Sequence, residues 1–326
     1  AHATFDEAEV EARTILNVYK TFCEDFMAVP VVDGVKSEGE KFPGAEHTYT
    51  IEAMTQDNRA IQAGTSHHLG QNFAKAFDVT FTNAEGKLEH VYATSWGVST
   101  RLVGALIMVH SDDNGLVCPP RLAPIQVVIV PIGRGEDREA VLQAADKLGD
   151  EIKALSYGDR PIRVKIDDRE KESPGFKFNH WEMRGVNLRI ELGPRDLAEG
   201  KAVLAQRHNG EKETVDLGGL ALKIPGLLAQ QQSDLLARAK AMREAQTRRV
   251  DTWDEFKALC EKDGGVGFIV AHWDGTQETE DAINEATKCT IRCIPLEALD
   301  PSDLEPGVCV YSGKPSSRRV IFARAY

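Results

Sequence analysis

The chain has 326 residues, of which 42% are hydrophobic and 28% charged, so it has the composition of a globular protein with room for two or three domains. No run of about 18 apolar residues is present, so no membrane span is expected, and six scattered cysteines do not suit a secreted disulfide framework. The net charge of -12 excludes a protein that coats DNA or RNA nonspecifically, because such coating needs clustered Lys and Arg. It does not exclude recognition of a few unpaired RNA bases.

The first 93 residues predict one helix followed by short strands. Thr4 and Glu7 form a capping-box pattern ahead of helically spaced apolar residues, so a helix of about 20 residues is expected after Thr4. Pro30 makes the first of the strands that follow an edge strand at best. Gly, Asn and Asp separate these strands, which favours an antiparallel sheet with strands at residues 29–32, 49–53, 60–63, 79–81 and 91–93.

The next segment, residues 94–101 (TSWGVSTR), predicts a small-residue turn that delivers Arg101 to the start of the apolar run 102–109. Periodicity does not decide whether this run is a helix or a strand. An arginine in such a place is more often a cap or an ion-pair partner than a phosphate ligand. Spacing alone therefore does not establish a phosphate site.

After Pro119 and Pro120 the predicted elements alternate, which favours a parallel or mixed sheet covered by helices. Strands are expected at residues 127–131, 162–166, 188–192 and 202–206, and helices at residues 136–155 and 176–183. A long polar helix over residues 227–248 then leads to a last region, whose apolar stretches are residues 266–270, 291–294 and 320–322.

A second polar segment, residues 62–73 (QAGTSHHLGQNF), gathers hydroxyls, amides and two imidazoles. Ser66, His67 and Cys23 raise the hypothesis of a nucleophilic hydrolase. No G-x-S-x-G turn precedes a helix here, which argues against it. Of the two histidines, His68 is expected to be structural, because neighbouring strand residues face opposite ways.

Three stretches together carry a family resemblance: TIEAMTQDNRAIQAGTSHHLGQNFAKAF, TSWGVSTRLVGALIMVHSDDNGLVCPPRLAPIQVVIVPI and GFKFNHWEMRGVNLRIELGPRDL. They resemble prolyl-tRNA synthetases, class II aminoacyl-tRNA synthetases, in their archaeal and eukaryotic form. The resemblance covers nearly the whole chain and implies an α+β and α/β multidomain fold. It implies the C-terminal part of an antiparallel-sheet catalytic domain with its third motif (residues 1–123), a mixed α/β anticodon-binding domain (124–223), a linker helix (224–249) and a small α/β C-terminal module (250–326).

The same resemblance implies that the first two class II motifs, including the homodimer interface, lie in an N-terminal part that the chain lacks. The segment at the start, AHATFDEAEVEA, has neither the basic end nor the apolar centre of a signal peptide, so a cytoplasmic location is expected. Because the first two motifs are missing, the isolated chain is expected to be inactive.

Amino-acid activation joins a carboxylate to the α-phosphate of ATP, and such a displacement needs alignment and positive charge more than a general base. ATP and Mg²⁺ are therefore the expected cofactors. Arg101 matches the family's third-motif arginine, which lies against the nucleotide and is the expected catalytic residue; Gln62 and Ser99 join it at the expected ATP site. The residues expected at the L-proline site are Thr65, His67, Ser95, Trp96, Gly97 and His2.

For tRNA(Pro), the resemblance implies recognition of two successive guanines in the anticodon. An aromatic ring stacks on a base, Arg donates to guanine O6 and N7, and a carboxylate accepts from guanine N1 and N2. Glu182 has the alternative of simply pairing with a nearby arginine. The residues on matching positions are Phe178, Glu182, Arg189, Asp196 and Lys212.

The C-terminal module resembles a family domain that often holds zinc on four cysteines. Here the four positions are Asp274, Thr279, Cys309 and Ser312, and one thiolate cannot build a tetrahedral zinc site, so no zinc is expected. Tyr326 keeps the family's C-terminal tyrosine, whose carboxylate turns toward the active site.

The leading hypothesis is a ligase that activates L-proline with ATP and transfers it to tRNA(Pro). The alternative from another class is a noncatalytic RNA-binding or regulatory paralogue that retains the anticodon-binding domain. A sister enzyme of the threonyl or histidyl type is a lesser alternative.

Overall fold

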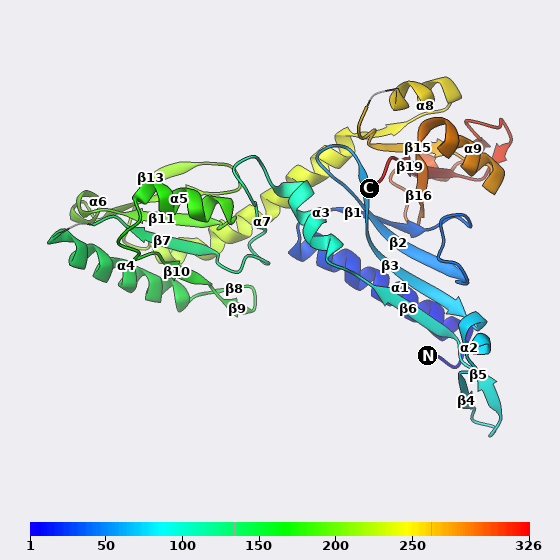
Figure 1. The fold of residues 1–326 in the computed structure, drawn as a ribbon, viewed down its shortest axis with the longest axis horizontal. Coiled ribbons are helices and arrows are strands. Elements are labelled where there is room, and N and C mark those ends of the chain that lie inside the picture. Colours follow the sequence, from blue (N-terminus) through cyan, green and yellow to red (C-terminus); the bar gives the residue numbers. More distant parts are fainter. Residues whose placement is uncertain (134, 262) are drawn as a thin grey trace. The chain divides into compact units, whose positions relative to one another are not determined.

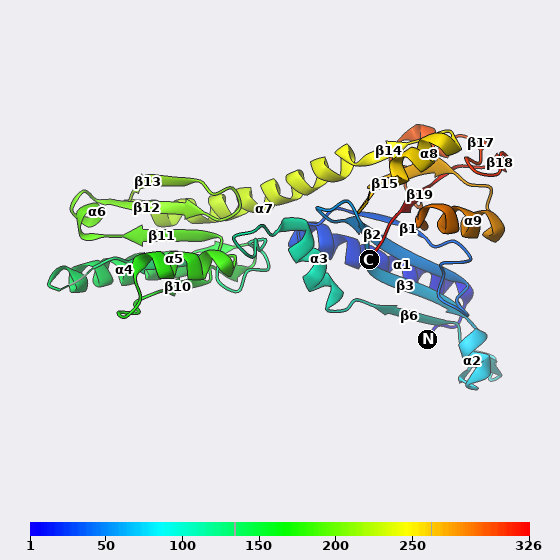
Figure 2. The ribbon, with the colours of Figure 1, turned by 45° about the horizontal axis from the view of Figure 1, so that its top comes forward.

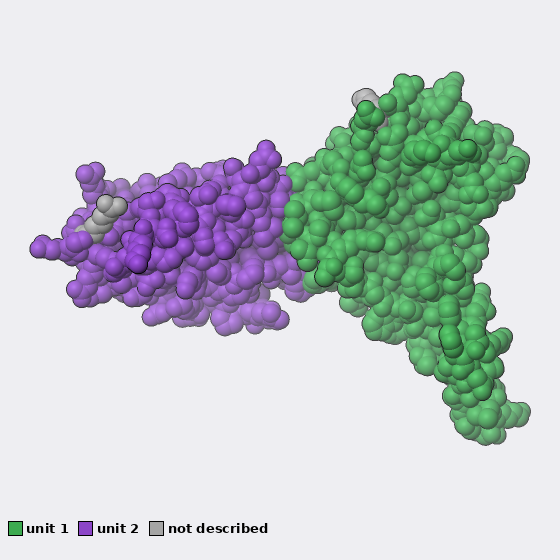
Figure 3. Space-filling model, in the orientation of Figure 1, with its two compact units in different colours: residues 1–25, 29–109, 240–326 green, residues 26–28, 110–239 purple. Residues whose placement is uncertain are grey.

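The computed structural model describes residues 1–133, 135–261 and 263–326. They form two compact units, coloured separately in Figure 3. Unit 1 consists of Ala1–Asp25, Val29–Val109 and Lys240–Tyr326, and unit 2 of Phe26–Ala28 and His110–Ala239. Each unit has its own sheet.

Unit 1 is built on an eight-stranded sheet in which segments from both ends of the chain lie side by side (Figures 1 and 2). Most neighbouring strands are antiparallel; β14 and β15 are parallel. The strand order is β14 (Thr247–Arg249), β15 (Phe268–His272), β19 (Arg319–Ala323), β16 (Thr290–Pro295), β1 (Val31–Val35), β2 (His47–Met54), β3 (Ala60–Gly70) and β6 (Ala93–Gly97).

Helix α1 (Phe5–Thr21) covers one face of β2, β3 and β6, and it begins as the sequence predicts. The Thr4 hydroxyl accepts from the amide of Glu7, and the Glu7 carboxylate accepts from the amide of Ala3. The remaining smaller elements of unit 1 are a π-helical turn (Phe22–Phe26, shared with unit 2), α2 (Asn72–Ala76), β4 (Thr80–Thr82), β5 (Leu88–His90), α3 (Arg101–His110), α8 (Trp253–Cys260), α9 (Gln277–Thr287), a 3-10 turn (Pro301–Leu304), β17 (Gly307–Val308) and β18 (Pro315–Ser316).

Strand β1 corrects one sequence prediction, because it is an interior strand. Pro30 precedes the strand and removes no ladder hydrogen bond, so β1 pairs with β2 on one side and with β16 on the other. This pairing joins the C-terminal segment to the N-terminal strands in one sheet. Gly34 is needed there, since a Cβ would lie 2.5 Å from the Cβ of Cys293.

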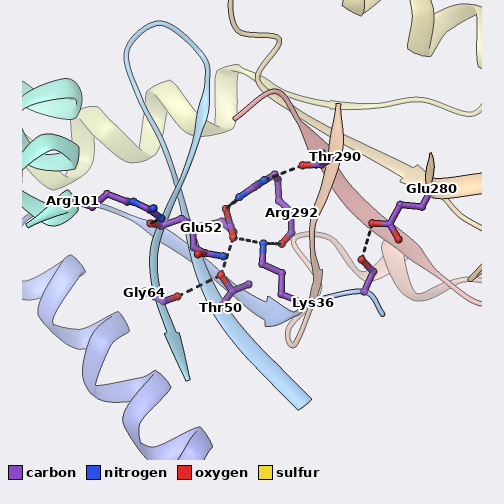
Figure 4. A network of polar contacts seen from close by, with 10 residues as sticks. Lys36, Thr50, Glu52, Gly64, Arg101, Glu280, Thr290 and Arg292 are labelled. Carbon is purple, nitrogen blue, oxygen red and sulfur yellow. Dashed lines mark hydrogen bonds and ion pairs between the residues drawn. The ribbon is translucent and has the colours of Figure 1, made fainter. Parts of the chain in front are cut away.

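A buried ion cluster fixes this junction (Figure 4). Glu52 on β2 is fully buried and accepts from the Lys36 ammonium at 2.8 Å and from Nε and Nη2 of Arg292 on β16 at 3.0 Å each. The Thr50 hydroxyl also donates to it, at 2.8 Å. One carboxylate thus neutralises part of the charge of two cations whose other donors bind the Arg292 carbonyl and the Thr290 hydroxyl.

Unit 2 holds a five-stranded mixed sheet, as the alternating pattern predicts. Strands β10, β7 and β11 are parallel, and β12 and β13 continue the sheet antiparallel. Helices α4 and α7 cover one face and α5 the other. The elements are β7 (Val127–Pro131), α4 (Asp137–Lys153), β8 (Ser156–Tyr157), β9 (Arg160–Pro161), β10 (Val164–Ile166), α5 (Pro174–Met183), β11 (Leu188–Leu192), α6 (Pro194–Ala198), β12 (Lys201–Gln206), β13 (Lys212–Asp216) and α7 (Leu220–Ala245).

Three further elements differ from the sequence prediction, in their start, their type or their pairing. Helix α7 begins seven residues before residue 227 and contains Pro225, because Leu220 and Ile224 are fully buried in the core of unit 2 and hold its first turns. The predicted turn at residues 94–97 is instead most of strand β6, which pairs with β3. The strand predicted at residues 79–81 leaves the main sheet and pairs only with β5.

The four positions at which the resemblance implies zinc ligands, Asp274, Thr279, Cys309 and Ser312, lie around the Asp274 carboxylate. Its Oδ2 accepts from the hydroxyls of Ser312 at 2.6 Å and Thr279 at 2.9 Å, and its Oδ1 from the hydroxyl of Thr276 at 2.8 Å. The Cys309 sulfur accepts from the amide of Ser312. Hydroxyl donors around one carboxylate do not fit a zinc ion, which prefers thiolate and imidazole ligands.

All six cysteines are free and buried. Among the described residues, no helix is long and apolar enough to cross a membrane.

A buried carboxyl links α9 to the segment after β1. Glu280 Oε1 accepts from the Ser37 hydroxyl at 2.7 Å, while Oε2 is buried with no hydrogen-bond partner among the described residues. Burial, with smaller contributions from Glu40 and Asp281, raises the pKa of Glu280 from 4.5 to about 7. The protonated form is therefore the one that the fold prefers.

Glu280→Gln is expected to stabilise the protein above neutral pH. Because the folded-state pKa is raised, the contribution of Glu280 to stability is present below pH 4.5 and is lost as pH rises to about 7. The variant should exceed the wild-type unfolding free energy by about 1–3 kcal/mol at pH 8 and match it at pH 4.5 in urea titrations. Glu278→Gln, an exposed carboxylate of the same helix, is the control; equal pH profiles for all three proteins would contradict the assignment.

Asp274→Asn is expected to destabilise the C-terminal module without any role for zinc. Burial alone would raise the pKa of the Asp274 carboxyl. Hydrogen bonds from Ser312, Thr276 and Thr279 outweigh burial and lower this pKa to about 2. The ionised form thus contributes stability above pH 3.8 that is lost as pH falls toward 2. We expect a loss of about 1.5–3 kcal/mol at pH 7, no loss for the exposed control Asp254→Asn, and an unchanged melting temperature in EDTA. Stoichiometric zinc and melting by EDTA would refute this account.

Candidate functional site

A β-bulge aligns the predicted nucleotide and proline residues of β3. Residue Ile51 pairs with Gly64 and Glu52 with Gln62, so Ala63 is the extra residue. The bulge shifts the alternation and leaves Gln62, Thr65 and His67 half-buried, while Ser66 is fully buried. Gln62 is thereby brought onto the exposed face of Thr65 and His67.

Arg101 lies at the first residue of α3 and faces this part of β3. Its Nη1 donates to the Gln62 carbonyl at 3.3 Å, and its amide donates to the Ser99 hydroxyl at 3.2 Å. A guanidinium at a helix N-terminus is a suitable place for phosphate, because the backbone dipole adds to its positive charge. The surrounding cavity measures about 280 Å³ and is lined by Gln62, Ala63, Gly64, Thr65, Gly97, Val98, Ser99 and Arg101.

The buried ion cluster lies beside this cavity, since Glu52 is paired with Gln62 on the neighbouring strand. Figure 4 shows Arg101, Glu52 and Arg292 in one close-up view. The chain end also meets β3 here: the amide of Ala60 donates to the Arg324 carbonyl at 2.8 Å, and the amide of Tyr326 donates to the Ala60 carbonyl at 3.2 Å. The last residues therefore run beside the strand two positions before Gln62.

His67 occupies the same face as Thr65. Its Nδ1 lies 3.0 Å from the Thr48 hydroxyl and its ring packs against Phe42. Burial lowers the pKa of His67, so the imidazole is neutral at pH 7. A neutral imidazole can hydrogen-bond an ammonium without repelling it.

The strand pairing divides the predicted proline residues between two faces. Thr65 lies opposite Gly97 and His67 opposite Ser95, so these four share one face. Trp96 lies opposite the buried Ser66, on the face covered by α1, where it is 49% exposed. The structure therefore does not bring Trp96 to the cavity.

His2 lies on that second face as well. Its Nε2 is 3.1 Å from the hydroxyl of Thr94, which is the residue paired with His68. His68 itself is fully buried and bonds the Phe5 carbonyl and the Gly70 amide. His68 is therefore structural, as predicted.

A second candidate site lies in unit 2, between α5 and the first residues of β11 and β13. The Arg189 guanidinium stands over the Phe178 ring at 4.5 Å from its centroid, and the Lys212 ammonium at 5.5 Å. Glu182 Oε2 is 4.0 Å from Arg189 Nη1. Glu182, Arg189 and Lys212 line one cavity of about 410 Å³. Together with the Phe178 ring beside the two cations, these side chains match the chemistry of guanine recognition.

Asp196 is separate from this set. It lies in the first turn of α6, beyond the other end of β11, where its Oδ2 accepts from the Gly193 amide at 3.0 Å. The residue that sequence reasoning missed is Glu191, which contacts both Arg189 and Lys212. The alternation of β11, which places Glu191 on the same face as Arg189, could have indicated it.

The described residues contain no group of three or more His, Cys, Asp and Glu side chains arranged to hold a metal ion.

Comparisons with known proteins identify domains of the chain and its relatives. Residues 126–226 match the family model described as anticodon binding domain, and residues 253–326 match that of the prolyl-tRNA synthetase C-terminal domain. Proline--tRNA ligases of Flavobacterium johnsoniae and Bacteroides fragilis are 54% identical and that of Cytophaga hutchinsonii 55% identical, over 100% of this chain and 64% of each relative. The chain thus spans less than two thirds of the length of these curated relatives.

A solved structure gives the same result at the level of fold. The prolyl-tRNA synthetase of Cryptosporidium parvum, complexed with L-proline and AMP, is 37% identical and superposes with a TM-score of 0.89, covering 100% of this chain and 68% of the other. The antiparallel and mixed sheets described above are therefore those of this enzyme class. The chain belongs to the prolyl-tRNA synthetase family.

Proposed function

We propose that the chain is part of an enzyme that activates L-proline with ATP and transfers it to tRNA(Pro). The observation that carries the proposal is the cavity in which Arg101, Gln62 and Ser99 meet Thr65. It stands in a chain whose relatives are named proline--tRNA ligase. A homodimer and a cytoplasmic location accompany the proposal on the family resemblance.

In the proposed reaction the proline carboxylate attacks the α-phosphate of ATP and pyrophosphate leaves. Arg101, at the positive end of α3, would stabilise the charge that develops on the phosphate oxygens. Mg²⁺ would enter with the phosphates of ATP and neutralise part of their charge. Gln62 and Ser99 would orient the nucleotide, since both line the cavity beside Arg101.

Thr65 and the neutral His67 would hold the proline amine, and Ser95 and Gly97 border the same face. Trp96 and His2 remain weaker candidates because they lie on the other face of the sheet. Phe178, Glu182, Arg189 and Lys212 would read the anticodon. Asp196 is a weaker candidate, because it lies beyond the other end of β11 and its carboxylate caps α6.

The competing proposal, a noncatalytic RNA-binding paralogue, requires only the cavity of unit 2. It predicts anticodon binding without activation chemistry. Pyrophosphate exchange separates the two because it needs no tRNA.

The full-length protein is expected to exchange pyrophosphate into ATP only when proline is present. Arg101→Ala should reduce the exchange rate by about 100-fold or more, because it removes a preorganised charge at the transition state. Arg160→Ala, an exposed arginine of unit 2, is the matched control and should retain wild-type exchange. The 326-residue chain alone should show none.

Absence of proline-dependent exchange in the full-length protein would refute the enzyme proposal and favour the RNA-binding paralogue. Exchange driven by threonine or histidine in place of proline would instead identify a sister enzyme of the same class.

A further inference from the structure

We propose that Glu191 is the positioning residue of the anticodon pocket: it fixes Arg189 and Lys212 in the geometry that distinguishes guanine from other bases. The inference rests on the proposed anticodon reading and concerns its specificity.

Glu191 contacts both cations directly. Its Oε1 accepts a hydrogen bond from Nε of Arg189 at 3.1 Å and is ion-paired with Nη2 of the same residue, also at 3.1 Å, and its Oε2 accepts from the Lys212 ammonium at 2.8 Å. Its side chain is only 7% exposed. Because both oxygens are engaged inside the protein, Glu191 acts on RNA through the two cations.

The register of the sheet explains why such a residue is needed. Arg189 lies opposite Ala205 on β12, and Ala205 lies opposite Lys212 on β13, so the three form one row across the sheet. The two cations are then two strand spacings apart, about 10 Å between their backbones. The methyl group of Ala205 fills little of the space between them.

Glu191 lies two residues along β11 from Arg189 and therefore on the same face. From there its carboxylate bridges diagonally to both side chains above the small Ala205. Two cations directed toward one aromatic ring repel each other, and the shared carboxylate offsets that repulsion. Lys212, whose side chain is 49% exposed, would otherwise be free to extend into solvent.

Glu182, a second carboxylate beside Arg189, has a different role. Glu182 is 38% exposed, lies 4.0 Å from Arg189 and lines the cavity. Its carboxylate is accessible to a base edge, whereas that of Glu191 is not. Glu182 would thus contact the base, and Glu191 would position the two cations.

Loss of Glu191 has two separable effects on RNA binding. Removing a negative charge strengthens attraction to every RNA equally, since phosphate attraction is independent of sequence. Releasing the cations weakens the distinction between guanine and other bases, since that distinction depends on bidentate geometry. The ratio of affinities for matched and mismatched loops therefore isolates the positioning role.

The test uses the 326-residue chain and RNA stem-loops that carry the tRNA(Pro) anticodon loop, with the two guanines intact or replaced singly by adenine. Dissociation constants are compared for wild type, Glu191→Gln and Glu213→Gln. Glu213 is an exposed carboxylate on β13 of the same sheet, and its substitution has the same charge change. Glu191→Gln should lower the guanine-to-adenine discrimination by about tenfold, and Glu213→Gln should leave it unchanged.

A double variant identifies the route of the effect. In Lys212→Met, adding Glu191→Gln should cause no further loss at the guanine that Lys212 reads, because the effects of residues acting through one contact are not additive. If Glu191→Gln fails to fold by circular dichroism, Glu191→Asp replaces it; its shorter side chain keeps the charge but cannot reach both cations, so the same loss is expected.

Unchanged discrimination in a folded Glu191 variant would overturn the proposal. If the wild-type chain binds the stem-loops but does not distinguish guanine from adenine, the anticodon assignment itself fails, and the positioning role with it.

Discussion

Burial of the Glu52 carboxylate between Lys36 and Arg292 is the constraint on which unit 1 depends. Oε1 of Glu52 accepts from Lys36 and Thr50, and Oε2 accepts from two nitrogens of Arg292, so one carboxylate joins the N-terminal strands to β16. Removing one partner from a buried ionic group of this kind costs about 3–5 kcal/mol, because the remaining charge is left unpaired in the interior. The ion cluster therefore stabilises the pairing of β1 with β16, which joins the two groups of strands in one eight-stranded sheet.

The same sheet positions the residues of the candidate catalytic cavity. Glu52 pairs with Gln62 across the bulge that turns Gln62 toward the face of Thr65 and His67, and the last residues of the chain run beside Ala60. Residues from both ends of the chain thus support one site. Unit 2 also has carboxylates that each bind two donors on its α5 face. The buried Asp167 accepts from Arg169 and Trp181, and Glu191 binds Arg189 and Lys212.

Local signals in the sequence predict much of this fold, and pairing over long distances accounts for what they miss. Thr4 and Glu7 mark the start of α1, and alternation predicts the mixed sheet of unit 2. Proximity to Pro30 suggested an edge strand, but whether a strand is interior depends on partners more than 250 residues away. The family resemblance identified Arg101 and Arg189, whereas the bulge at Ala63, the face of Trp96 and the bridging role of Glu191 follow only from register.

The proposed function combines a proline-activating cavity and a reader of two anticodon guanines in one protein. The most direct test is aminoacylation of tRNA(Pro) transcripts by the full-length protein, with radiolabelled proline and with threonine or alanine as competing amino acids. We predict charging with proline that falls by about tenfold or more when either guanine is replaced. Proline charging that is indifferent to both guanines, or preferential charging with another amino acid, would contradict the account.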